Sequence, residues 1–194
     1  MSHSKDFFIN TQADASYQSM RPPENLQSFQ ASLIERMQAR DHGSQSARRL
    51  AVAIGAQACL IPLSHTSEIV SLAGHALTRV PATRPWFRGL LNLRGNLIGI
   101  ADLAALAGAP AQASGAGSHA VVLAPSLEAQ CGLLISAVLG LRDISEMTPI
   151  SKNDEGRIEL PAVNGSYKDK DGTCWDELDL AALAKHEVFL QVGR

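Results

Sequence analysis

This 194-residue chain has few aromatic residues, little net charge and only short apolar runs. Aromatics make up 5% of the residues, and the formal net charge is −2. A chain without a basic stripe is not suited to nucleic acid as its main partner. Its apolar runs are far shorter than the roughly 20 residues of a transmembrane helix, so we expect no direct insertion into a membrane. The first residues carry no basic segment followed by a long apolar stretch, so we expect no export signal either.

Cysteine is also scarce, and the three that occur are widely spaced: Cys59, Cys131 and Cys174. An odd, small number of cysteines fits a reducing cytoplasm rather than a disulfide framework. No Cys-x-x-Cys pair exists, and the closest internal histidines are His65 and His75. The sequence therefore predicts no metal site and no bound cofactor.

Apolar residues are abundant at 45%, so the chain can build a core, mainly from Leu, Ile, Val and Ala. Residues 1–45 read as an N-terminal extension, with an amphipathic helix over about 24–41. Two prolines precede it, and its apolar face has helical spacing: Leu26, Phe29, Leu33, Ile34 and Met37. This helix either packs on its own domain or docks on a partner.

Residues 46–192 read as a β domain, because many short apolar segments are separated by Gly and Pro. The expected strands include 49–54, 58–63, 77–80, 119–124, 131–139, 173–178 and 188–192. We expect a helical turn within 64–70 and a turn at Asn164-Gly165. A loop of small residues over about 110–118 is predicted to separate two β units, and its Gly-Ala-Gly lacks the Lys of a phosphate-binding loop.

A five-residue repeat links the two halves of this domain. Asp-Leu-Ala-Ala-Leu occurs at 102–106 and again at 179–183, each time after a predicted strand. Aspartate is a favoured helix N-cap, so each copy predicts a strand that leads into a short capped helix. The repeat therefore predicts two similar β units.

The best-defined local feature is a hairpin over 86–101 that leads into the first of these helices. Its arms are apolar, and Arg94-Gly95 forms the tip, where Gly95 can adopt the positive φ of a tight turn. Folding does not require a charged residue at this tip. Glu68 is a candidate partner for Arg94, and a guanidinium is well suited to binding another protein.

Residues for catalysis are hard to assemble. Cys131 with His119 is the best nucleophile and base, but Cys131 begins an apolar strand where a buried thiol is inert. Asp176, Glu177 and Asp179 form an acidic group that we interpret as a solvated strand edge plus a helix cap.

Several segments resemble the CheW-like domain family over about residues 48–190. Residues 89–95 read Gly-Leu-Leu-Asn-Leu-Arg-Gly and 98–103 read Ile-Gly-Ile-Ala-Asp-Leu, similar to the family's G-x-x-N-L-R-G-x-x-x-P-x-x-D-L hairpin. Supporting matches lie at 61–63, 68–70, 80–81 and 132–138.

The resemblance implies a mainly β fold of two intertwined SH3-like five-stranded barrels and no enzymatic activity. It implies an adaptor that couples the cytoplasmic tips of chemoreceptors to the regulatory domain of a CheA-like histidine kinase, in arrays beneath the inner membrane. The residues that match the family's receptor-coupling surface are Arg94, Glu68, Gly89, Gly95 and Thr66.

The chain departs from the family pattern at three positions. Gly99 replaces a proline, which we expect to loosen the second hairpin arm; Thr66 replaces a valine and Ser136 an aspartate. With the N-terminal extension, these departures resemble PilI-type couplers of type IV pilus (twitching) systems. Two other functions stay open from the residues alone: a thiol-dependent hydrolase or redox enzyme using Cys131 and His119, and a β-barrel interaction module whose specificity lies in the N-terminal helix.

Overall fold

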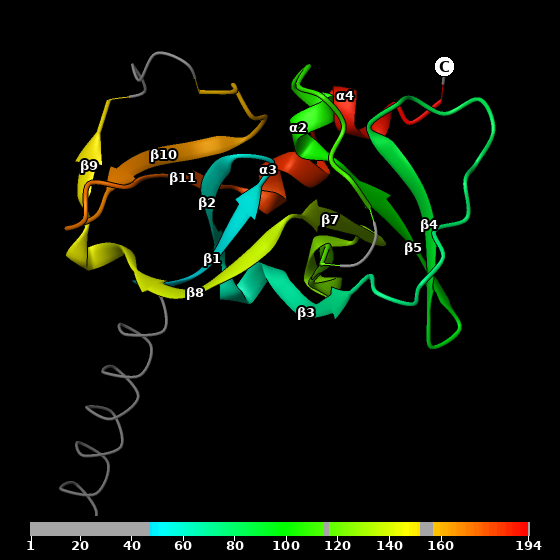
Figure 1. The fold of residues 1–194 in the computed structure, drawn as a ribbon, viewed down its shortest axis with the longest axis horizontal. Coiled ribbons are helices and arrows are strands. Elements are labelled where there is room, and N and C mark those ends of the chain that lie inside the picture. Colours follow the sequence, from blue (N-terminus) through cyan, green and yellow to red (C-terminus); the bar gives the residue numbers. More distant parts are fainter. Residues whose placement is uncertain (1–46, 115–116, 152–156, 194) are drawn as a thin grey trace, which may run out of the picture. The chain divides into compact units, whose positions relative to one another are not determined.

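Two β-sheets contain the eleven strands of the described residues (Figure 1). The computed structural model of the chain describes residues 47–114, 117–151 and 157–193, so the helix predicted over 24–41 lies outside the described residues. The strands are β1 (Arg48–Ile54), β2 (Gln57–Pro62), β3 (Thr66–Ser71), β4 (Phe87–Leu93), β5 (Asn96–Ala101), β6 (His119–Leu123), β7 (Cys131–Ile135), β8 (Ala137–Asp143), β9 (Thr148–Ile150), β10 (Val163–Lys168) and β11 (Cys174–Leu178). The helices are α2 (Leu103–Leu106), α3 (Leu180–Ala184) and α4 (Glu187–Leu190), with 3-10 turns η1 (Leu63–His65), η2 (Pro125–Leu127) and η3 (Ile144–Glu146).

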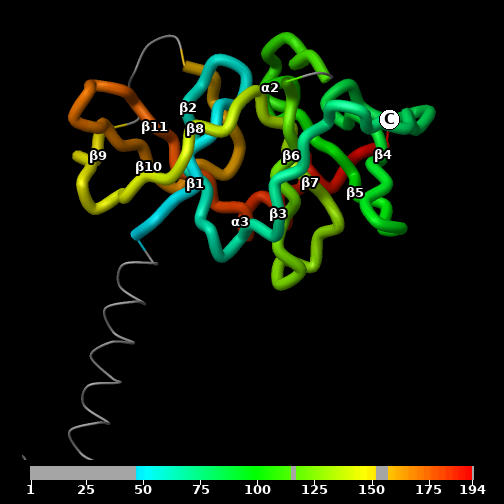
Figure 2. The backbone as a smooth tube through the Cα atoms, turned by 60° about the horizontal axis from the view of Figure 1, so that its bottom comes forward, coloured from blue at the N-terminus to red at the C-terminus, as the bar shows by residue number. Residues whose placement is uncertain are grey.

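The five-stranded sheet has the order β3-β6-β7-β5-β4. Its neighbours pair antiparallel except β5 and β7, which run parallel. The six-stranded sheet has the order β8-β1-β2-β11-β10-β9, again with one parallel pair, β2 and β11. The two sheets lie on opposite sides of the view in both Figure 1 and Figure 2.

The two sheets share one topology. Without β9, the order β8-β1-β2-β11-β10 reproduces β3-β6-β7-β5-β4 strand for strand, including the position of the parallel pair. The five-stranded unit uses consecutive strands, whereas the six-stranded unit takes β1 and β2 from the start of the domain and the rest from its end. The predicted mainly β fold with two intertwined five-stranded units is therefore confirmed, and β9 is an addition.

The chain changes sheets at η1 and at Ser136, between β7 and β8. Residues 110–118, predicted to separate the units, instead connect α2 to β6, and the strands on both sides of this loop, β5 and β6, belong to the five-stranded sheet. A loop of small residues marks a surface connection, but it carries no information about which strands pair.

The main hydrophobic core joins the two units. It contains Leu50 and Val52 of β1 together with Val121 of β6 and Leu133 of β7, all almost fully buried. Each sheet also has a smaller hydrophobic cluster of its own. In the five-stranded sheet it includes Leu91 and Leu134, and in the six-stranded sheet it includes Leu60 and Trp175. Burial of apolar surface on this scale is the main stabilising contribution to the fold.

The repeat at 102–106 and 179–183 forms the same structure twice, as predicted. Asp102 follows β5 and its Oδ1 accepts a hydrogen bond from the backbone of Ala105 in α2 at 3.2 Å. Asp179 follows β11 and accepts hydrogen bonds from Ala181 and Ala182 in α3 at 2.9 and 3.0 Å. The repeated motif therefore occupies equivalent positions in the two units.

Three local predictions were wrong and one was right only in part. The helical turn predicted within 64–70 is present as η1, but it ends at His65, and 66–71 form β3. Residues 188–192 do not form a strand because 187–190 are α4. Within the predicted strand 77–80 only Thr78 makes a β-bridge, to Leu90. Asn164-Gly165 lies inside β10, at an irregularity in its pairing with β11, and not at a turn.

Candidate partner-binding site

The tip of the β4–β5 hairpin is a tight two-residue turn. Leu93 pairs with Asn96, and the two residues between them both have positive φ, 52° at Arg94 and 89° at Gly95. Consecutive positive φ values suit the right-handed twist of a hairpin. The backbone N–H of Gly95 donates to Oδ1 of Asn92 at 2.9 Å, which fixes the turn.

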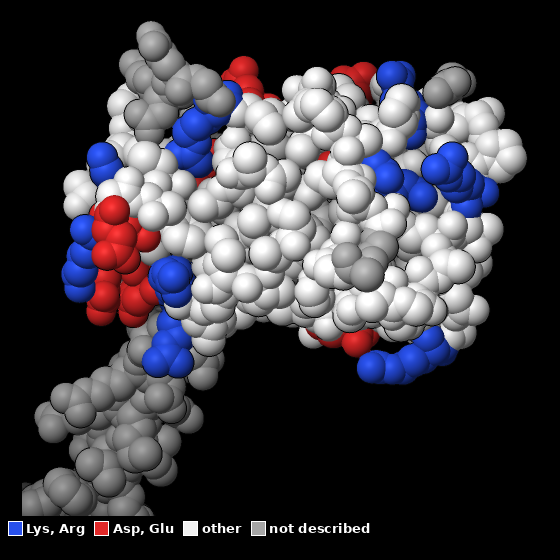
Figure 3. Space-filling view, in the orientation of Figure 1, with Lys and Arg blue, Asp and Glu red and all other residues white. Residues whose placement is uncertain are grey.

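Arg94 and Glu68 form an ion pair at this tip, with Arg94 Nη2 3.3 Å from Glu68 Oε2. The Arg94 side chain is 78% exposed and that of Glu68 is 32% exposed. Figure 3 shows basic atoms beside acidic atoms at the lower right edge of this face. An ion pair this exposed contributes little to the stability of the fold, so stability does not explain why charged residues occupy these two positions.

An open groove of about 410 Å³ adjoins the pair. Its floor includes Ile98 of β5 and Val122 of β6, and its rim includes Glu68, Arg94 and Glu128. An apolar floor with a charged rim can receive an apolar side chain of another protein while pairing with its charges.

Gly89 is buried inside β4, where it has a positive φ of 122°. A Cβ at this position would lie 2.4 Å from the carbonyl oxygen of Thr78. Two hydrogen bonds between Thr78 and Leu90, at 2.8 and 2.9 Å, hold that close approach. Only glycine fits here, so Gly89 sets the path of β4 rather than presenting a side chain to a partner.

Thr66 lies at the start of β3, just before an irregularity in the pairing of β3 with β6 that precedes Glu68. Its hydroxyl donates to the carbonyl oxygen of Pro62 at 3.3 Å. The threonine that replaces the family's valine therefore uses its polar atom within the fold, next to the strand that carries Glu68.

Two contacts hold β5 in place at Gly99. Its backbone N–H donates to the carbonyl oxygen of Gln130 at 3.0 Å, a hydrogen bond that proline cannot make. The ring of Phe87 covers the position, with Cε2 3.0 Å from where a Cβ would be. These two contacts restrain the second hairpin arm, although it lacks the family's proline.

Ser136 also has a defined role, at the crossover between the sheets. Its hydroxyl lies 3.1 Å from the carbonyl oxygen of Ala53 and 3.0 Å from that of Gly55, and its N–H donates to Ala53 at 2.9 Å. A hydroxyl can donate to these carbonyl groups, whereas an ionised aspartate could only repel them.

Sequence reasoning identified Asp102 as a helix cap but missed the polar cluster around it. Asp102 is fully buried and accepts hydrogen bonds from Gln112, from its backbone N–H at 2.7 Å and from Nε2 at 2.8 Å. Arg88 Nη1 lies 3.5 Å from the same carboxylate. Gln112 also accepts a hydrogen bond from the N–H of Gly55 at 2.8 Å, so one loop residue links the two units.

The proposed nucleophile and base are not brought together. His119 pairs with Ile135 at one end of the β6–β7 ladder, and Cys131 begins β7 at the other end. Four residues of strand separate their backbones by about 13 Å. Burial raises the pKa of the Cys131 thiol to about 11, which disfavours the thiolate. The prediction of a thiol-dependent enzyme using this pair is therefore wrong.

The acidic group in β11 is not a solvated edge. Asp176 and Glu177 are both buried. Glu177 Oε1 lies 2.6 Å from Nε of Arg49, and Asp176 accepts a hydrogen bond from the Ser166 hydroxyl at 2.6 Å and pairs with Arg157 at 2.9 Å. Partners distant in sequence neutralise these carboxylates, and the sequence gives no signal for them.

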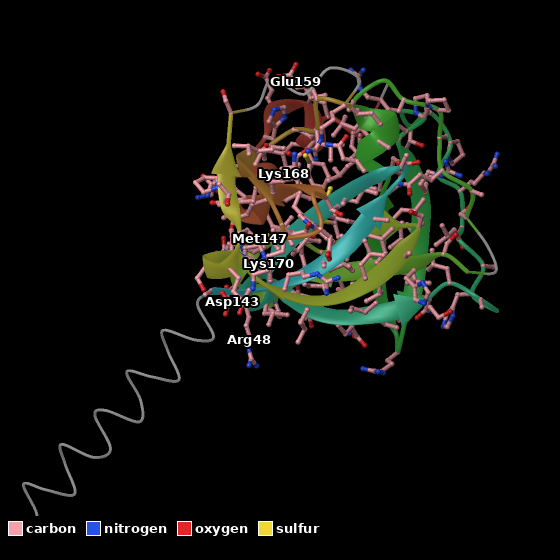
Figure 4. All side chains as sticks on the ribbon, turned by 60° about the vertical axis from the view of Figure 1, so that its left-hand side comes forward. Arg48, Asp143, Met147, Glu159, Lys168 and Lys170 are labelled. Atoms are coloured by element: carbon pink, nitrogen blue, oxygen red, sulfur yellow. The ribbon has the colours of Figure 1, made fainter. Side chains whose placement is uncertain are left out.

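A second exposed surface, which sequence reasoning did not single out, lies on β8. This strand is at an edge of the six-stranded sheet and exposes three large apolar residues, Val138, Leu139 and Leu141, by 40%, 40% and 52%. The side view in Figure 4 shows Arg48 and Asp143 at one end of the β1–β8 pair, where they are paired in register. An exposed apolar edge strand is suited to contact with another protein.

The described residues contain no group of three His, Cys, Asp or Glu side chains that could hold a metal ion. Over the same ranges, none of the helices has the length and apolar character needed to cross a membrane.

Comparison with known proteins agrees with the fold. A search of curated protein sequences found no significant match. Among solved structures, the chain is similar to the scaffolding protein TtCheW from Thermoanaerobacter tengcongensis, with a TM-score of 0.57 and 20% identity over 70% of this chain and 85% of that one. A profile of the CheW-like domain matches residues 48–188, most of the chain. The protein therefore belongs to the CheW-like domain family, whose scaffolding members are non-enzymatic adaptors.

Proposed function

We propose that this protein is an adaptor that couples the cytoplasmic tips of chemoreceptors to the regulatory domain of a CheA-like histidine kinase. It acts in the cytoplasm, in arrays held at the inner membrane by the receptors. The observation that supports this proposal most directly is the exposed Arg94–Glu68 pair beside an apolar groove, in a chain of the CheW-like family.

We assign the receptor to the surface around this pair. Arg94 and Glu68 make the direct contacts, because their charges are exposed and only weakly used by the fold. Gly95 and Gly89 act indirectly, by shaping the turn and the strand that present Arg94. Thr66 acts by positioning the start of β3.

An adaptor needs a second surface, and β8 is our candidate for the kinase. Its apolar side chains lie on the six-stranded sheet, whereas the Arg94–Glu68 pair lies on the five-stranded sheet. In Figure 3, uncharged atoms cover the middle of the face, over β1 and β8. Two partners can then bind at the same time, which coupling requires.

Binding to a receptor cytoplasmic tip and to a kinase regulatory domain, each measured by biolayer interferometry, tests the proposal. We expect wild type to bind both, and Arg94→Ala or Glu68→Ala to weaken receptor binding about tenfold, the loss of about 1.4 kcal/mol. Lys170→Ala is the matched control, because Lys170 is also 78% exposed and forms an ion pair with Glu146 at 3.2 Å. Equal losses for Lys170→Ala and Arg94→Ala would contradict the receptor assignment.

The charge-reversed double variant Arg94→Glu with Glu68→Arg separates two roles of the pair. If the pair only holds the hairpin, the double variant restores receptor binding because the ion pair re-forms. If each side chain contacts the receptor, both contacts become repulsive and binding stays weak. We expect the second result.

Leu141→Glu on β8 tests the kinase surface independently. We expect it to weaken kinase binding at least tenfold and to leave receptor binding intact, because a carboxylate would be buried without a partner. Val188→Glu on α4 is the control, since Val188 is also exposed, by 44%. Unchanged kinase binding in Leu141→Glu would exclude β8 as the kinase surface.

We further propose that the output is type IV pilus motility, as in PilI-type couplers. The support is the extension before residue 46, with its amphipathic pattern at 24–41, and the departures at Gly99, Thr66 and Ser136. Deleting the gene should shrink the twitching zone and leave swimming unchanged, and the full-length gene should restore twitching. A swimming defect with normal twitching would contradict the pilus assignment while leaving the adaptor function standing.

A further inference from the structure

A second cavity, separate in its lining from the proposed receptor surface, lies between the segment that follows β3 and the start of β4. It has a volume of about 300 Å³, and its polar lining comes from His75, Arg79, Arg88 and Ser114. Basic atoms gather near this end of β4 at the upper right of Figure 3.

Backbone hydrogen bonds fix the walls of this cavity. The N–H of Leu72 donates to the carbonyl oxygen of Ser118 at 2.9 Å, and that of His75 donates to Leu72 at 3.1 Å. The reciprocal bonds between Thr78 and Leu90 hold the segment against β4. The side chains that face the cavity therefore come from a backbone whose position is set by the fold.

The charged groups that line the cavity are cations. Arg88 donates from Nη2 to the Ser114 hydroxyl at 3.4 Å, and its Nη1 lies 3.5 Å from Asp102. Asp102 is fully buried behind Arg88 and does not line the cavity. Arg79 is exposed, and no carboxylate lies within ion-pair distance of it in the part of the chain that the structure describes.

We propose that this cavity binds a phosphate group. A guanidinium has five N–H donors, and those of Arg88 that Asp102 and Ser114 leave free can bind an oxyanion together with Arg79. His75 and Ser114 add two further polar groups at the rim. Phosphate, with four oxygens and about two negative charges, matches this donor set better than a carboxylate with two oxygens. The buried Asp102 carboxylate orients the Arg88 guanidinium through their ion pair.

Isothermal titration of the full-length protein with inorganic phosphate, at ionic strength balanced with chloride, tests the proposal. We expect one site, and at least tenfold weaker binding in Arg79→Gln, whose side chain makes no contact that the fold requires. Arg94→Gln, an exposed arginine outside the cavity, is the control and should bind phosphate as wild type does. Arg88→Gln should also lose binding, with circular dichroism to check its fold, since Arg88 contacts Asp102.

Acetate and a phosphoserine peptide complete the experiment. Acetate should bind at least tenfold more weakly than phosphate, and equal binding would overturn the phosphate assignment. Tighter binding of the peptide than of inorganic phosphate would support the proposal and identify a phosphorylated protein as the source; equal binding would support free phosphate. The proposal would be overturned if titration with phosphate released no more heat than the chloride control. It would also be overturned if Arg79→Gln bound phosphate with the affinity of wild type. Neither result bears on receptor coupling, which Arg79→Gln should leave intact.

Discussion

Gly89→Ala should destabilise the domain far more than alanine at the exposed hairpin tip. The new Cβ would lie 2.4 Å from the carbonyl oxygen of Thr78 and 2.9 Å from its carbonyl carbon, and both atoms are backbone. The φ of 122° adds strain of about 1–3 kcal/mol for a residue with a side chain. The clash cannot be relieved by a rotamer change, so β4 must move away from Thr78 and lose two hydrogen bonds. We expect a total cost of about 4 kcal/mol.

Gly95→Ala is the matched control, because Gly95 also has a positive φ, 89°, but no heavy atom lies within 4 Å of where its Cβ would be. Its cost should be backbone strain alone, about 1 kcal/mol. At roughly 2–4 °C per kcal/mol for a domain of this size, Tm should fall by about 8–16 °C in Gly89→Ala and about 2–4 °C in Gly95→Ala. Thermal unfolding followed by far-ultraviolet circular dichroism measures both. Equal Tm values for the two variants would refute the argument from close approach.

Three further predictions follow from buried or bonded groups. Asp102→Ala should lower the free energy of unfolding, measured in urea, by about 3 kcal/mol or more, because it leaves buried donors without partners. Asp179→Ala should lower it by only about 1 kcal/mol, the loss of a helix cap. Equal losses in the two variants would contradict the stabilising role of the polar cluster around Asp102. Cys131 should react slowly with a thiol reagent in the folded protein at pH 8, where a pKa of about 11 leaves about 0.1% thiolate, and its rate should rise about tenfold per pH unit up to pH 10. Fast reaction of Cys131 at pH 8 would contradict the raised pKa. The hydrogen bond from the Trp175 indole lowers the pKa of the Asp169 carboxyl in the folded state. The stability that this hydrogen bond contributes is therefore complete above the ordinary pKa of aspartate and is lost as pH falls through the lower pKa of the folded state. Trp175 fluorescence should change as pH falls through this lower pKa in wild type and not in Asp169→Asn.

The parts of the fold that were predicted correctly depend on local sequence. The β4–β5 hairpin follows from two apolar arms around Arg94-Gly95, and the two capped helices follow from aspartate before Leu-Ala-Ala-Leu. Turn and cap preferences act over a few residues, so they can be recognised without knowing the rest of the chain. The contact of Arg94 with Glu68 was a hypothesis from the same reasoning, and the structure brings the two side chains together.

The parts that were missed depend on contacts between distant residues. Gln112 lies in a loop of small residues, and only the fold reveals that its side chain reaches Asp102 and Gly55. Asp176 and Glu177 look like exposed charges in sequence, but their partners lie on strands far away in the chain. Burial of a charge is decided by the partners that tertiary structure supplies, and no local pattern encodes them.

The shared topology of the two units explains the wrong turn at Asn164-Gly165. In that topology β10 corresponds to β4, and each strand has an irregularity at a glycine, before Gly165 in one and before Gly89 in the other. Each strand also precedes the strand that leads into a capped helix. Aligning the chain on its two Asp-Leu-Ala-Ala-Leu copies would place both glycines inside strands, so the repeat carried more information than the turn preference of one dipeptide.

The same correspondence shows where the two units differ, and the difference supports assigning the receptor to the hairpin tip of the five-stranded unit. In the six-stranded unit the loop between β10 and β11 uses its acid internally: Asp169 accepts hydrogen bonds from the backbone of Thr173 at 2.8 Å and from the Trp175 indole at 2.8 Å. In the five-stranded unit the Arg94 guanidinium forms an ion pair with the partly exposed Glu68. The loop between β10 and β11 also carries Lys170, whose ion pair with Glu146 is at least as exposed as that of Arg94, so exposure alone does not distinguish the two tips. What favours the five-stranded unit is the groove that Glu68 and Arg94 line together with Ile98 and Val122. There Arg94 can exchange a weak ion pair for a contact with a partner whose apolar side chain enters the groove.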